Sequence, residues 1–258
     1  MRYNRLFMHL LFKTIRYDSL PSTNTEVARL ATEGAAEGLS VMAEEQTAGR
    51  GRLQRTWLSP KGAGLYFSVL LRPKLPLHLW PLITFVAALA ANDALEKGAN
   101  LQTDIKWPND LLAGERKICG ILSETVDTSQ GRAVVVGIGI NLKTDSYPPE
   151  LRDVATSVSE ATGKDPEKDR VLGLLQEGLS RWYSLLHDSD GPQKILNAWV
   201  NRSSYGSGRT VDVINGESTF RGVTRGLESD GALRVETESE GIVIVRAGDV
   251  VSVRQIKQ

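Results

Sequence analysis

The sequence has few of the residues that form covalent or metal cross-links. Its one cysteine, Cys119, excludes an intramolecular disulfide and fits a reducing compartment. The three histidines stand at positions 9, 78 and 187, too far apart in sequence to form a recognisable metal-binding motif. The chain must therefore be stabilised by its hydrophobic core, and the sequence identifies no metal ligands.

An excess of charge of one sign is also absent. Lys plus Arg equals Asp plus Glu at 31 each, so no overall basic field favours nucleic acid, although a local basic site stays compatible. No run approaches the roughly 20 apolar residues that span a bilayer. The apolar stretch 6–12 is short, and no small-residue cleavage site follows it. We therefore expect a cytoplasmic protein without a membrane segment.

The 258 residues are enough for one large domain and a small one. Apolar runs predict strands at 15–17, 39–44, 65–71, 104–107, 117–126 and 133–142. Helical spacing predicts helices at 80–97, with Gly98 as the stop, at 170–187 and at 191–200. Thr23 and Glu26 have the spacing of a capping box that opens a helix towards Gly34. This order favours an α+β domain with an antiparallel or mixed sheet over a purely parallel one.

The character of the chain changes after residue 201. Residues 203–208 form a linker-like stretch rich in Ser and Gly. Beyond it, short alternating strands are separated by the hairpin signals Asn215-Gly216, Asp230-Gly231 and Glu240-Gly241. We expect an N-terminal extension at 1–14, a main domain at 15–203 and a small β-barrel at 204–258.

The strongest local signal is Gly49-Arg50-Gly51-Arg52, followed by Arg55 and Trp57. Glycines let the backbone approach a ligand, and arginines supply planar, permanently charged donors for carboxylate or phosphate. A solvated basic turn or an RGG-like RNA contact would have the same composition. Alone, this loop does not decide between these interpretations.

Three further segments carry polar groups at strand or helix ends. Lys106-Trp107-Pro108-Asn109-Asp110 places an ammonium, an amide and a carboxylate at one sheet edge, although an ordinary turn would look alike. Ser22-Thr23-Asn24 suits a helix cap, a neutral polar ligand or an anion. Gly137-Ile138-Gly139-Ile140-Asn141 is a strand that a ligand or another backbone approaches closely. No Walker A sequence occurs, and Cys119 is better explained as a core residue.

The order of these segments resembles that of the biotin–protein ligase family, over about residues 15–258. The pair Gly-Arg-Gly-Arg and Lys-Trp-Pro-Asn-Asp carries the resemblance. It implies a class II synthetase-like mixed sheet with flanking helices and an SH3-like C-terminal barrel. Bifunctional members have an N-terminal winged helix that binds an operator. Because only about fourteen residues precede the first expected strand, we expect a monofunctional ligase that does not bind DNA.

The resemblance implies that biotin and ATP form biotinyl-5′-AMP, and that biotin then passes to a lysine of a biotin carboxyl carrier domain, such as that of acetyl-CoA carboxylase. Mg²⁺ is expected to shield the pyrophosphate leaving group. The implied catalytic residues are Lys106, Arg52 and Asp110, with Asp110 orienting or deprotonating the attacking amine. A homodimer is compatible with this fold.

The resemblance assigns the neutral ureido ring to hydroxyl and amide side chains, the apolar parts of biotin to glycine-lined strands, and the nucleotide to Arg55, Trp57 and Asn141. The full set of expected ligand-binding residues is Ser22, Thr23, Asn24, Gln46, Gly49, Arg50, Gly51, Arg52, Arg55, Trp57, Lys106, Gly120, Gly139 and Asn141. A lipoate ligase or octanoyltransferase of the same fold is the nearest alternative, and a non-enzymatic nucleic-acid- or peptide-binding protein is the second.

Overall fold

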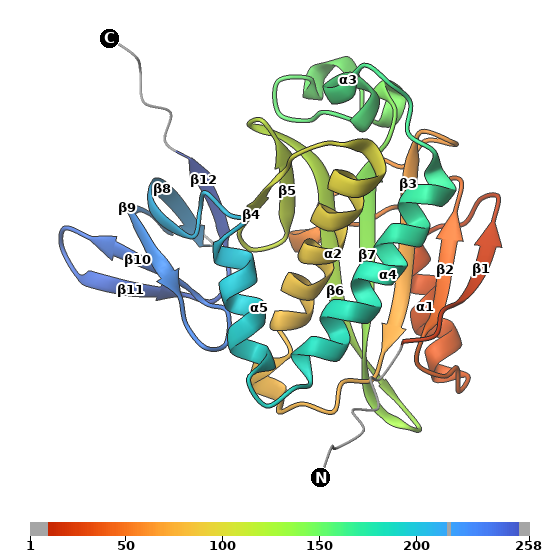
Figure 1. Cartoon of the computed structure of the whole chain (residues 1–258), viewed down its shortest axis with the longest axis horizontal. Coiled ribbons are helices and arrows are strands. Elements are labelled where there is room, and N and C mark those ends of the chain that lie inside the picture. The colour runs from red at the N-terminus through yellow and green to blue at the C-terminus, as the bar shows by residue number, and fades with distance from the viewer. Residues whose placement is uncertain (1–9, 216–217, 253–258) are drawn as a thin grey trace.

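The computed structural model describes residues 10–215 and 218–252. Its larger part is a seven-stranded sheet in the order β1-β2-β3-β7-β6-β5-β4, in which β1 and β2 are parallel and every other pair is antiparallel (Figure 1). The strands are β1 Lys13–Tyr17, β2 Leu39–Ala43, β3 Gly64–Leu71, β4 Asp104–Lys106, β5 Asp110–Ala113, β6 Arg116–Thr128 and β7 Gly131–Asn141. The predicted mixed sheet is confirmed.

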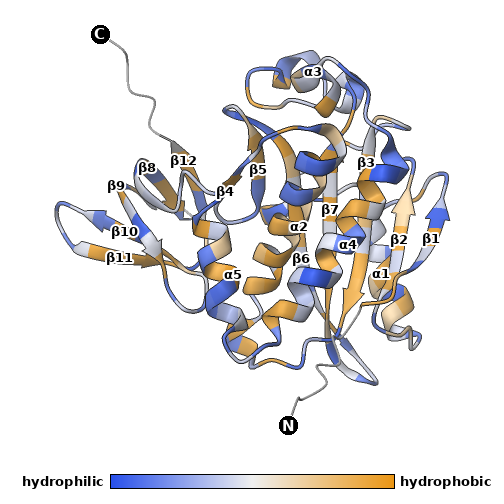
Figure 2. Cartoon of the chain, viewed as in Figure 1, coloured by the Kyte–Doolittle hydropathy of each residue, from blue (hydrophilic) through white to orange (hydrophobic). Residues whose placement is uncertain are grey.

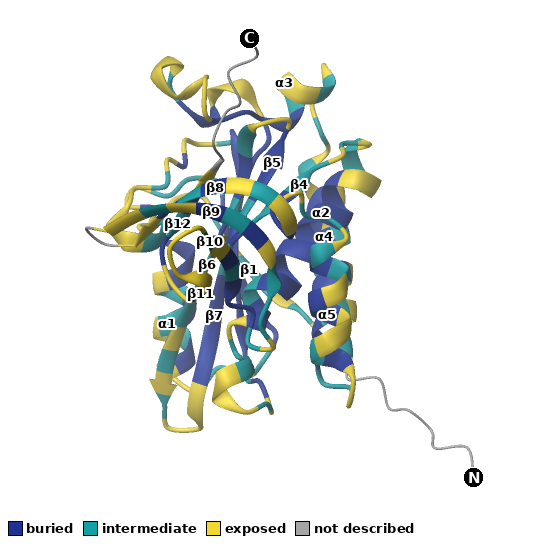
Figure 3. Ribbon diagram, turned by 90° about the vertical axis from the view of Figure 1, so that its left-hand side faces the viewer, coloured by how far each residue is buried: buried dark blue, intermediate teal, exposed yellow. Residues whose placement is uncertain are grey.

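Helices cover both faces of this sheet. The helices are α1 Thr23–Thr32, α2 Leu82–Ala99, α3 Val158–Thr162, α4 Lys168–Leu186 and α5 Gly191–Val200. Seen edge-on, α1 lies on one side of the sheet and α2, α4 and α5 on the other (Figure 3). The predicted strand 65–71 lies within β3, all eight of whose residues are buried between these layers. Apolar side chains accordingly gather along β3, β7 and α2 (Figure 2).

The start of α1 differs from the predicted capping box by one residue. Ser22 is the N-cap, with extended backbone (φ −160°, ψ 130°) and a hydroxyl that accepts from the Thr25 amide. The Glu26 carboxylate does not cap the helix but accepts from the Tyr17 hydroxyl at 2.8 Å. Thr23 is the first residue of the helix, and its hydroxyl donates to the side chain of Gln46.

The end of α2 also differs from prediction. Gly98 does not stop the helix, which continues to Ala99, and Asn100 takes the left-handed cap conformation at φ 50°. Gly98 instead lies against α4, where an added Cβ would be 3.1 Å from Leu174. The glycine therefore serves close packing between two helices, and the asparagine serves the turn.

Sequence reasoning missed short elements. It predicted a turn at 108–110 but not strand β5, which pairs with both β4 and β6. It also missed α3 and the 3₁₀ turns Arg52–Gln54, Leu77–Leu79, Thr144–Ser146 and Pro149–Leu151. These elements have three to five residues each, too short for a hydrophobic period to be visible.

The C-terminal region forms a second sheet, which is antiparallel and ordered β11-β10-β9-β8-β12. Its strands are β8 Ser207–Asn215, β9 Ser218–Leu227, β10 Leu233–Thr237, β11 Gly241–Val245 and β12 Asp249–Ser252. The predicted hairpins at Asp230-Gly231 and Glu240-Gly241 are present, with both glycines at positive φ. Gly216 of the third lies outside the described residues, although Asn215 pairs with Ser218. This confirms the expected small β domain.

One helical stretch, Leu77–Ala99, is long and apolar enough to cross a membrane by length and composition alone. It is not a continuous apolar run, because Asn92, Asp93, Glu96 and Lys97 interrupt it. Of its most apolar window, 67% is buried inside the protein, where α2 packs against α4 and the sheet. Packing in the core accounts for its composition.

Two glycines of α4 give a matched test of this packing. Nothing lies within 4 Å of a Cβ added at Gly173, whereas one added at Gly178 would be 3.1 Å from the Ala90 Cα of α2. Gly173→Ala should raise the free energy of unfolding by about 0.5–1 kcal/mol through helix propensity. Gly178→Leu should lower it by about 1–3 kcal/mol through overpacking. Urea denaturation measures both, and a shift of the same sign would contradict this view of the α2–α4 interface.

Candidate functional site

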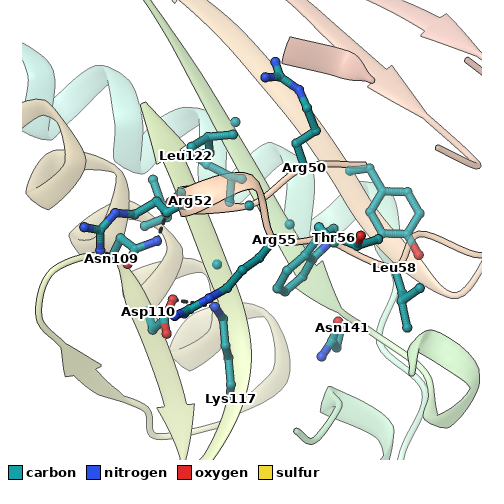
Figure 4. Close-up of a pocket in the computed structure, with 18 of the residues that line it drawn as sticks. Arg50, Arg52, Arg55, Thr56, Leu58, Asn109, Asp110, Lys117, Leu122 and Asn141 are labelled. Carbon is teal, nitrogen blue, oxygen red and sulfur yellow. Dashed lines mark hydrogen bonds and ion pairs between the residues drawn. The ribbon is translucent and has the colours of Figure 1, made fainter. Parts of the chain in front are cut away.

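A cavity of about 240 Å³ lies on the α1 side of the large sheet. It is bounded by the N-terminus of α1, the glycines of β6 and β7, the loop 46–59 and the segment 144–155 (Figure 4). Its lining includes thirteen of the predicted residues: Ser22, Thr23, Asn24, Gln46, Arg50, Gly51, Arg52, Arg55, Trp57, Asp110, Gly120, Gly139 and Asn141. Segments far apart in the sequence thus meet at one place.

One end of the cavity is a network of neutral polar groups. The Gln46 amide oxygen accepts from the Thr23 backbone amide at 2.8 Å and from the Thr23 hydroxyl at 3.0 Å. The Asn24 amide donates to Glu124 at 2.8 Å, and its oxygen accepts from Ser68 at 2.7 Å. Ser22, Thr23 and Asn24 are each buried at 5% exposure or less. Their partners fix the side chains, so this end is preorganised for an uncharged ligand with donors and acceptors.

The floor of the cavity has no side chains at three positions. Gly120 of β6 pairs with Gly139 of β7, and Gly137 lies one step along the same face of β7. A Cβ at Gly137 would lie 2.1 Å from the Asn24 oxygen, and one at Gly139 would lie 2.5 Å from the Trp57 indole nitrogen. The glycines therefore admit Asn24 and the Trp57 ring directly against the backbone. The indole N–H is buried and has no hydrogen-bond partner in the part of the chain that the structure describes.

The other end of the cavity carries three cations. Arg52 and Arg55 come from the loop, and Lys117 comes from the start of β6. Arg50, also from the loop, belongs with the polar network, because its guanidinium and the Asn24 amide donate to the same Glu124 oxygen. Arg50 and Arg52 leave the loop in different directions (Figure 4). The Lys117 ammonium lies 5.3 Å from the Trp57 ring centroid, a cation–π distance that also links it to the floor. Such a cluster can bind carboxylate and phosphate oxygens together.

Each of these cations faces a carboxylate. Arg50 lies 3.1 Å from Glu124, Lys117 lies 2.6 Å from Asp110, and Arg55 pairs with Asp249. Asn109, beside Asp110, does not cap its own turn: it accepts from Arg52 at 3.2 Å and donates to the Ile121 carbonyl at 2.7 Å. An anionic ligand would therefore have to displace these carboxylates from their ion pairs with the cations.

Arg52 is the most buried of the three loop arginines. Burial lowers the pKa of its guanidinium, while Asp249 and Asp110 act in the opposite direction. Its side chain spans two parts of the protein, because it also donates to the Gly248 carbonyl of the C-terminal region at 3.2 Å.

Two predicted residues do not line the cavity. Gly49 is packed inside the loop, where an added Cβ would be 2.3 Å from the Trp57 carbonyl, so it has a structural role. Lys106 is the other, and its ammonium lies 5.9 Å from the Tyr205 ring centroid. Burial lowers the pKa of Lys106, and Lys117 lowers it further, against the pull of Asp110.

Sequence reasoning missed Lys117, Glu124, Asp249 and the segment that contributes Ser146, Tyr147, Leu151, Val154 and Ala155 to the cavity. Strand alternation places residues three apart on opposite faces, so the sequence gives no signal that Lys117 and Gly120 enter the same site. The register of β6 against β5 shifts between these two residues, which breaks that alternation. The segment 144–155 has no periodic pattern, and Asp249 comes from another sheet, so neither had a local signal.

The expected cysteine and metal interpretations can also be checked. Cys119 is fully buried, and burial raises the pKa of its thiol, as expected of a core residue. Within residues 10–215 and 218–252, no group of three His, Cys, Asp or Glu side chains could hold a metal ion.

A comparison with known proteins identifies the family. The sequence profile described as "Biotin/lipoate A/B protein ligase family" matches residues 8–141, just over half of the chain. The chain belongs to the biotin/lipoate A/B protein ligase family. The match covers the Ser-Thr-Asn segment, the arginine loop and both glycine strands.

Relatives that match most of the chain are ligases by name. "Bifunctional ligase/repressor BirA" of Bacillus spizizenii is 38% identical over 250 residues, which are 94% of this chain and 73% of that protein. "Biotin--[acetyl-CoA-carboxylase] ligase" of Paracoccus denitrificans is 37% identical over 82% of this chain and 89% of its own length. The biotin protein ligase of Aquifex aeolicus, solved with biotin and ATP, is 31% identical with a TM-score of 0.81, covering 94% of this chain and 99% of that one.

A double-mutant cycle tests the glycine floor. Gly139→Ala should lower the free energy of unfolding by about 1–3 kcal/mol, because its methyl overlaps the Trp57 indole. In a Trp57→Ala background the same change should cost less than about 0.5 kcal/mol, since the ring is gone. Equal costs in both backgrounds, measured by denaturant unfolding, would mean that the indole does not lie on this floor.

Proposed function

We propose that this protein is an ATP-dependent biotin–protein ligase that forms biotinyl-5′-AMP and transfers biotin to a lysine of a carrier protein. The observation that carries the proposal is the lining of one cavity of about 240 Å³: buried hydroxyls and amides at one end, and Arg52, Arg55 and Lys117 at the other. Biotin has the matching ends, a neutral ureido ring and a carboxylate. The Aquifex relative, described with biotin and ATP bound, supports the same pair of substrates.

The neutral end suits the ureido ring, which has two N–H donors and one carbonyl. The carbonyl would accept from the Ser22 hydroxyl, whose proton is not used in the network, and an N–H group would donate to the Asn24 oxygen, which accepts one bond from Ser68. Because the side chains of this network are already fixed by Ser59, Ser68 and Glu124, little side-chain entropy is lost on binding. The glycine floor and Trp57 would supply apolar contact for the rest of biotin.

The cationic end suits the reaction that follows. The carboxylate of biotin must approach the α-phosphate of ATP although both are negatively charged, so positive charge must already be in place. Arg50, Arg52 and Lys106 are the groups that we propose for this task, with Lys106 bridging the carboxylate and α-phosphate oxygens. Lys117, whose ammonium lies at the cavity, is added to them.

In the transfer step an uncharged lysine amine attacks the mixed anhydride. Asp110 remains our candidate to orient or deprotonate that amine, and it does so from an ion pair with Lys117. The same carboxylate thus links the two steps: Lys117 would leave it for the substrate's anions, which frees Asp110 for the amine.

Magnesium is expected to enter with ATP. No metal cage exists among the described residues, and Mg²⁺ in such sites is held largely by phosphate oxygens and water. We therefore propose no metal ligand among the side chains of the protein.

The Paracoccus relative is named for acetyl-CoA carboxylase, which supports a biotin carboxyl carrier domain as the acceptor. A cytoplasmic location fits this partner. Homodimer formation, the absence of DNA binding and a separate folding boundary near residue 203 stay predictions.

Biotin-dependent exchange of ³²P-pyrophosphate into ATP tests the proposed function. We expect exchange with biotin but not with lipoate, followed by biotin transfer to a carrier domain. A ligand at 100 times its Kd also adds about 2.7 kcal/mol to stability, so biotin should raise the Tm and lipoate should not. Exchange with lipoate would favour the lipoate ligase alternative. Salt-sensitive nucleic-acid binding without exchange would favour the binding protein.

Removal of Arg52 tests the expectation that the loop retains the reactive adenylate. Arg52→Gly deletes the contacts to Asn109 and Gly248 that hold the loop over the cavity. The variant should still form adenylate but release it faster, and should label lysines of bystander proteins such as albumin. Arg132→Gly, which removes an exposed arginine from the distant β6–β7 hairpin, is the control. If Arg52→Gly shows neither faster release nor stray labelling, Arg52 stabilises charge alone.

A further inference from the structure

One side chain of the second sheet enters the cavity. Asp249 is the first residue of β12, and among the cavity-lining residues within the described ranges it alone comes from the C-terminal sheet. Its side chain is 21% exposed, so it lies in the wall and not on open surface.

The position of Asp249 is set by its own sheet. Asp249 pairs with Ile214 of β8, and Gly248 before it has φ 124°. An added Cβ at Gly248 would lie 2.6 Å from the Ile214 carbonyl. A turn that tolerates only glycine therefore directs the carboxylate towards the loop, independently of whether the loop is there.

The carboxylate lies between two loop arginines. Its Oδ2 accepts from the Arg55 guanidinium, and its Oδ1 lies 3.9 Å from Arg52 Nη1. Arg52 is additionally bonded to the backbone carbonyl of Gly248, a contact that does not depend on the Asp249 charge. The Asp249 carboxylate and the Gly248 carbonyl therefore hold Arg52 by two separate interactions, and only the first depends on the charge of Asp249.

Asp249 differs from the other acids at the site. Glu124 and Asp110 neutralise Arg50 and Lys117 from within the large sheet, whereas Asp249 joins the loop to the second sheet. A single carboxylate is a weaker ligand for two arginines than a polyphosphate, which presents several charged oxygens to both.

We propose that Asp249 competes with the phosphates of ATP for Arg52 and Arg55, so that nucleotide binding breaks this link between the loop and the C-terminal sheet. The inference rests on the proposed function, because it places the nucleotide's phosphates at these arginines. By linkage, whatever loosens the second sheet from the loop favours ATP, and ATP in turn loosens the sheet.

Titration calorimetry with inorganic pyrophosphate and with ATP tests the competition. Asp249→Asn keeps the shape and removes the charge, so it should bind both about fivefold more tightly, with a gain that shrinks as salt is raised. Asp212→Asn is the matched control: it removes a carboxylate of the same sheet that pairs with Arg221 and lines no cavity. Biotin amide, which carries no charge, should bind the wild type, Asp249→Asn and Asp212→Asn with the same affinity.

Failure of the competition and failure of the proposed function would give different results. Unchanged or weaker pyrophosphate binding by Asp249→Asn, or an equal gain in Asp212→Asn, would overturn the competition. In the wild-type chain, ATP should speed hydrogen exchange of the amides at 249–252, and slower or unchanged exchange would also overturn it, even if the variant does not fold. Failure of the wild type to exchange pyrophosphate with ATP when biotin is present would instead remove the proposed function, while binding of pyrophosphate itself would still be measured.

Discussion

The absence of three side chains is the constraint on which the site depends. Gly120, Gly137 and Gly139 leave a bare strip of backbone on two paired central strands. Asn24 and Trp57 lie against this strip at distances that any Cβ would forbid. The strip therefore fixes how close α1 and the loop come to the sheet, and hence the depth of the cavity. Two long neighbouring strands hold it rigid, since β6 and β7 pair along ten residues.

The second constraint on the site is local charge neutrality: each cation at the cavity has a carboxylate beside it. Arg52 and Lys117 are partly buried, where an unpaired charge is costly, whereas Arg50 and Arg55 are more exposed, and each of the four has an acid nearby. The acids lower the cost of holding the cations in place before a substrate arrives. Binding then becomes a change of partner, and its free energy is a difference between two sets of ion pairs. The existing ion pairs therefore lower the affinity for an anionic substrate, but they keep the arginine and lysine donors correctly placed before it binds.

The sequence predicted the fold and most of the site because those features are local or periodic. Leu65 to Leu71 read as a central strand from its composition, and the Gly-Arg loop stood out by its spacing. Lys106 and Lys117 show where prediction from sequence stops. Both lie near a strand end, and their surroundings depend on the registers of β4 and β6 against β5. These registers bring Lys117 to the cavity and Lys106 beside Tyr205. Asp249 depends on the docking of a separate sheet, which no local pattern encodes.

The loop itself is a small hairpin. Gly51 donates to the Arg55 carbonyl at 2.7 Å, Trp57 donates to the Gly49 carbonyl at 3.0 Å, and Gln46 is bridged to Ser59 at its base. Its ladder is internal, so the hairpin can move as one body and keep the ladder, losing only the contacts of its arginine side chains to Glu124, Asn109, Gly248 and Asp249. Residues added at the tip, where Leu53 and Gln54 have positive φ, would leave the spacing of Arg50 and Arg55 intact. One residue inserted within the ladder would instead turn an arginine to the opposite face.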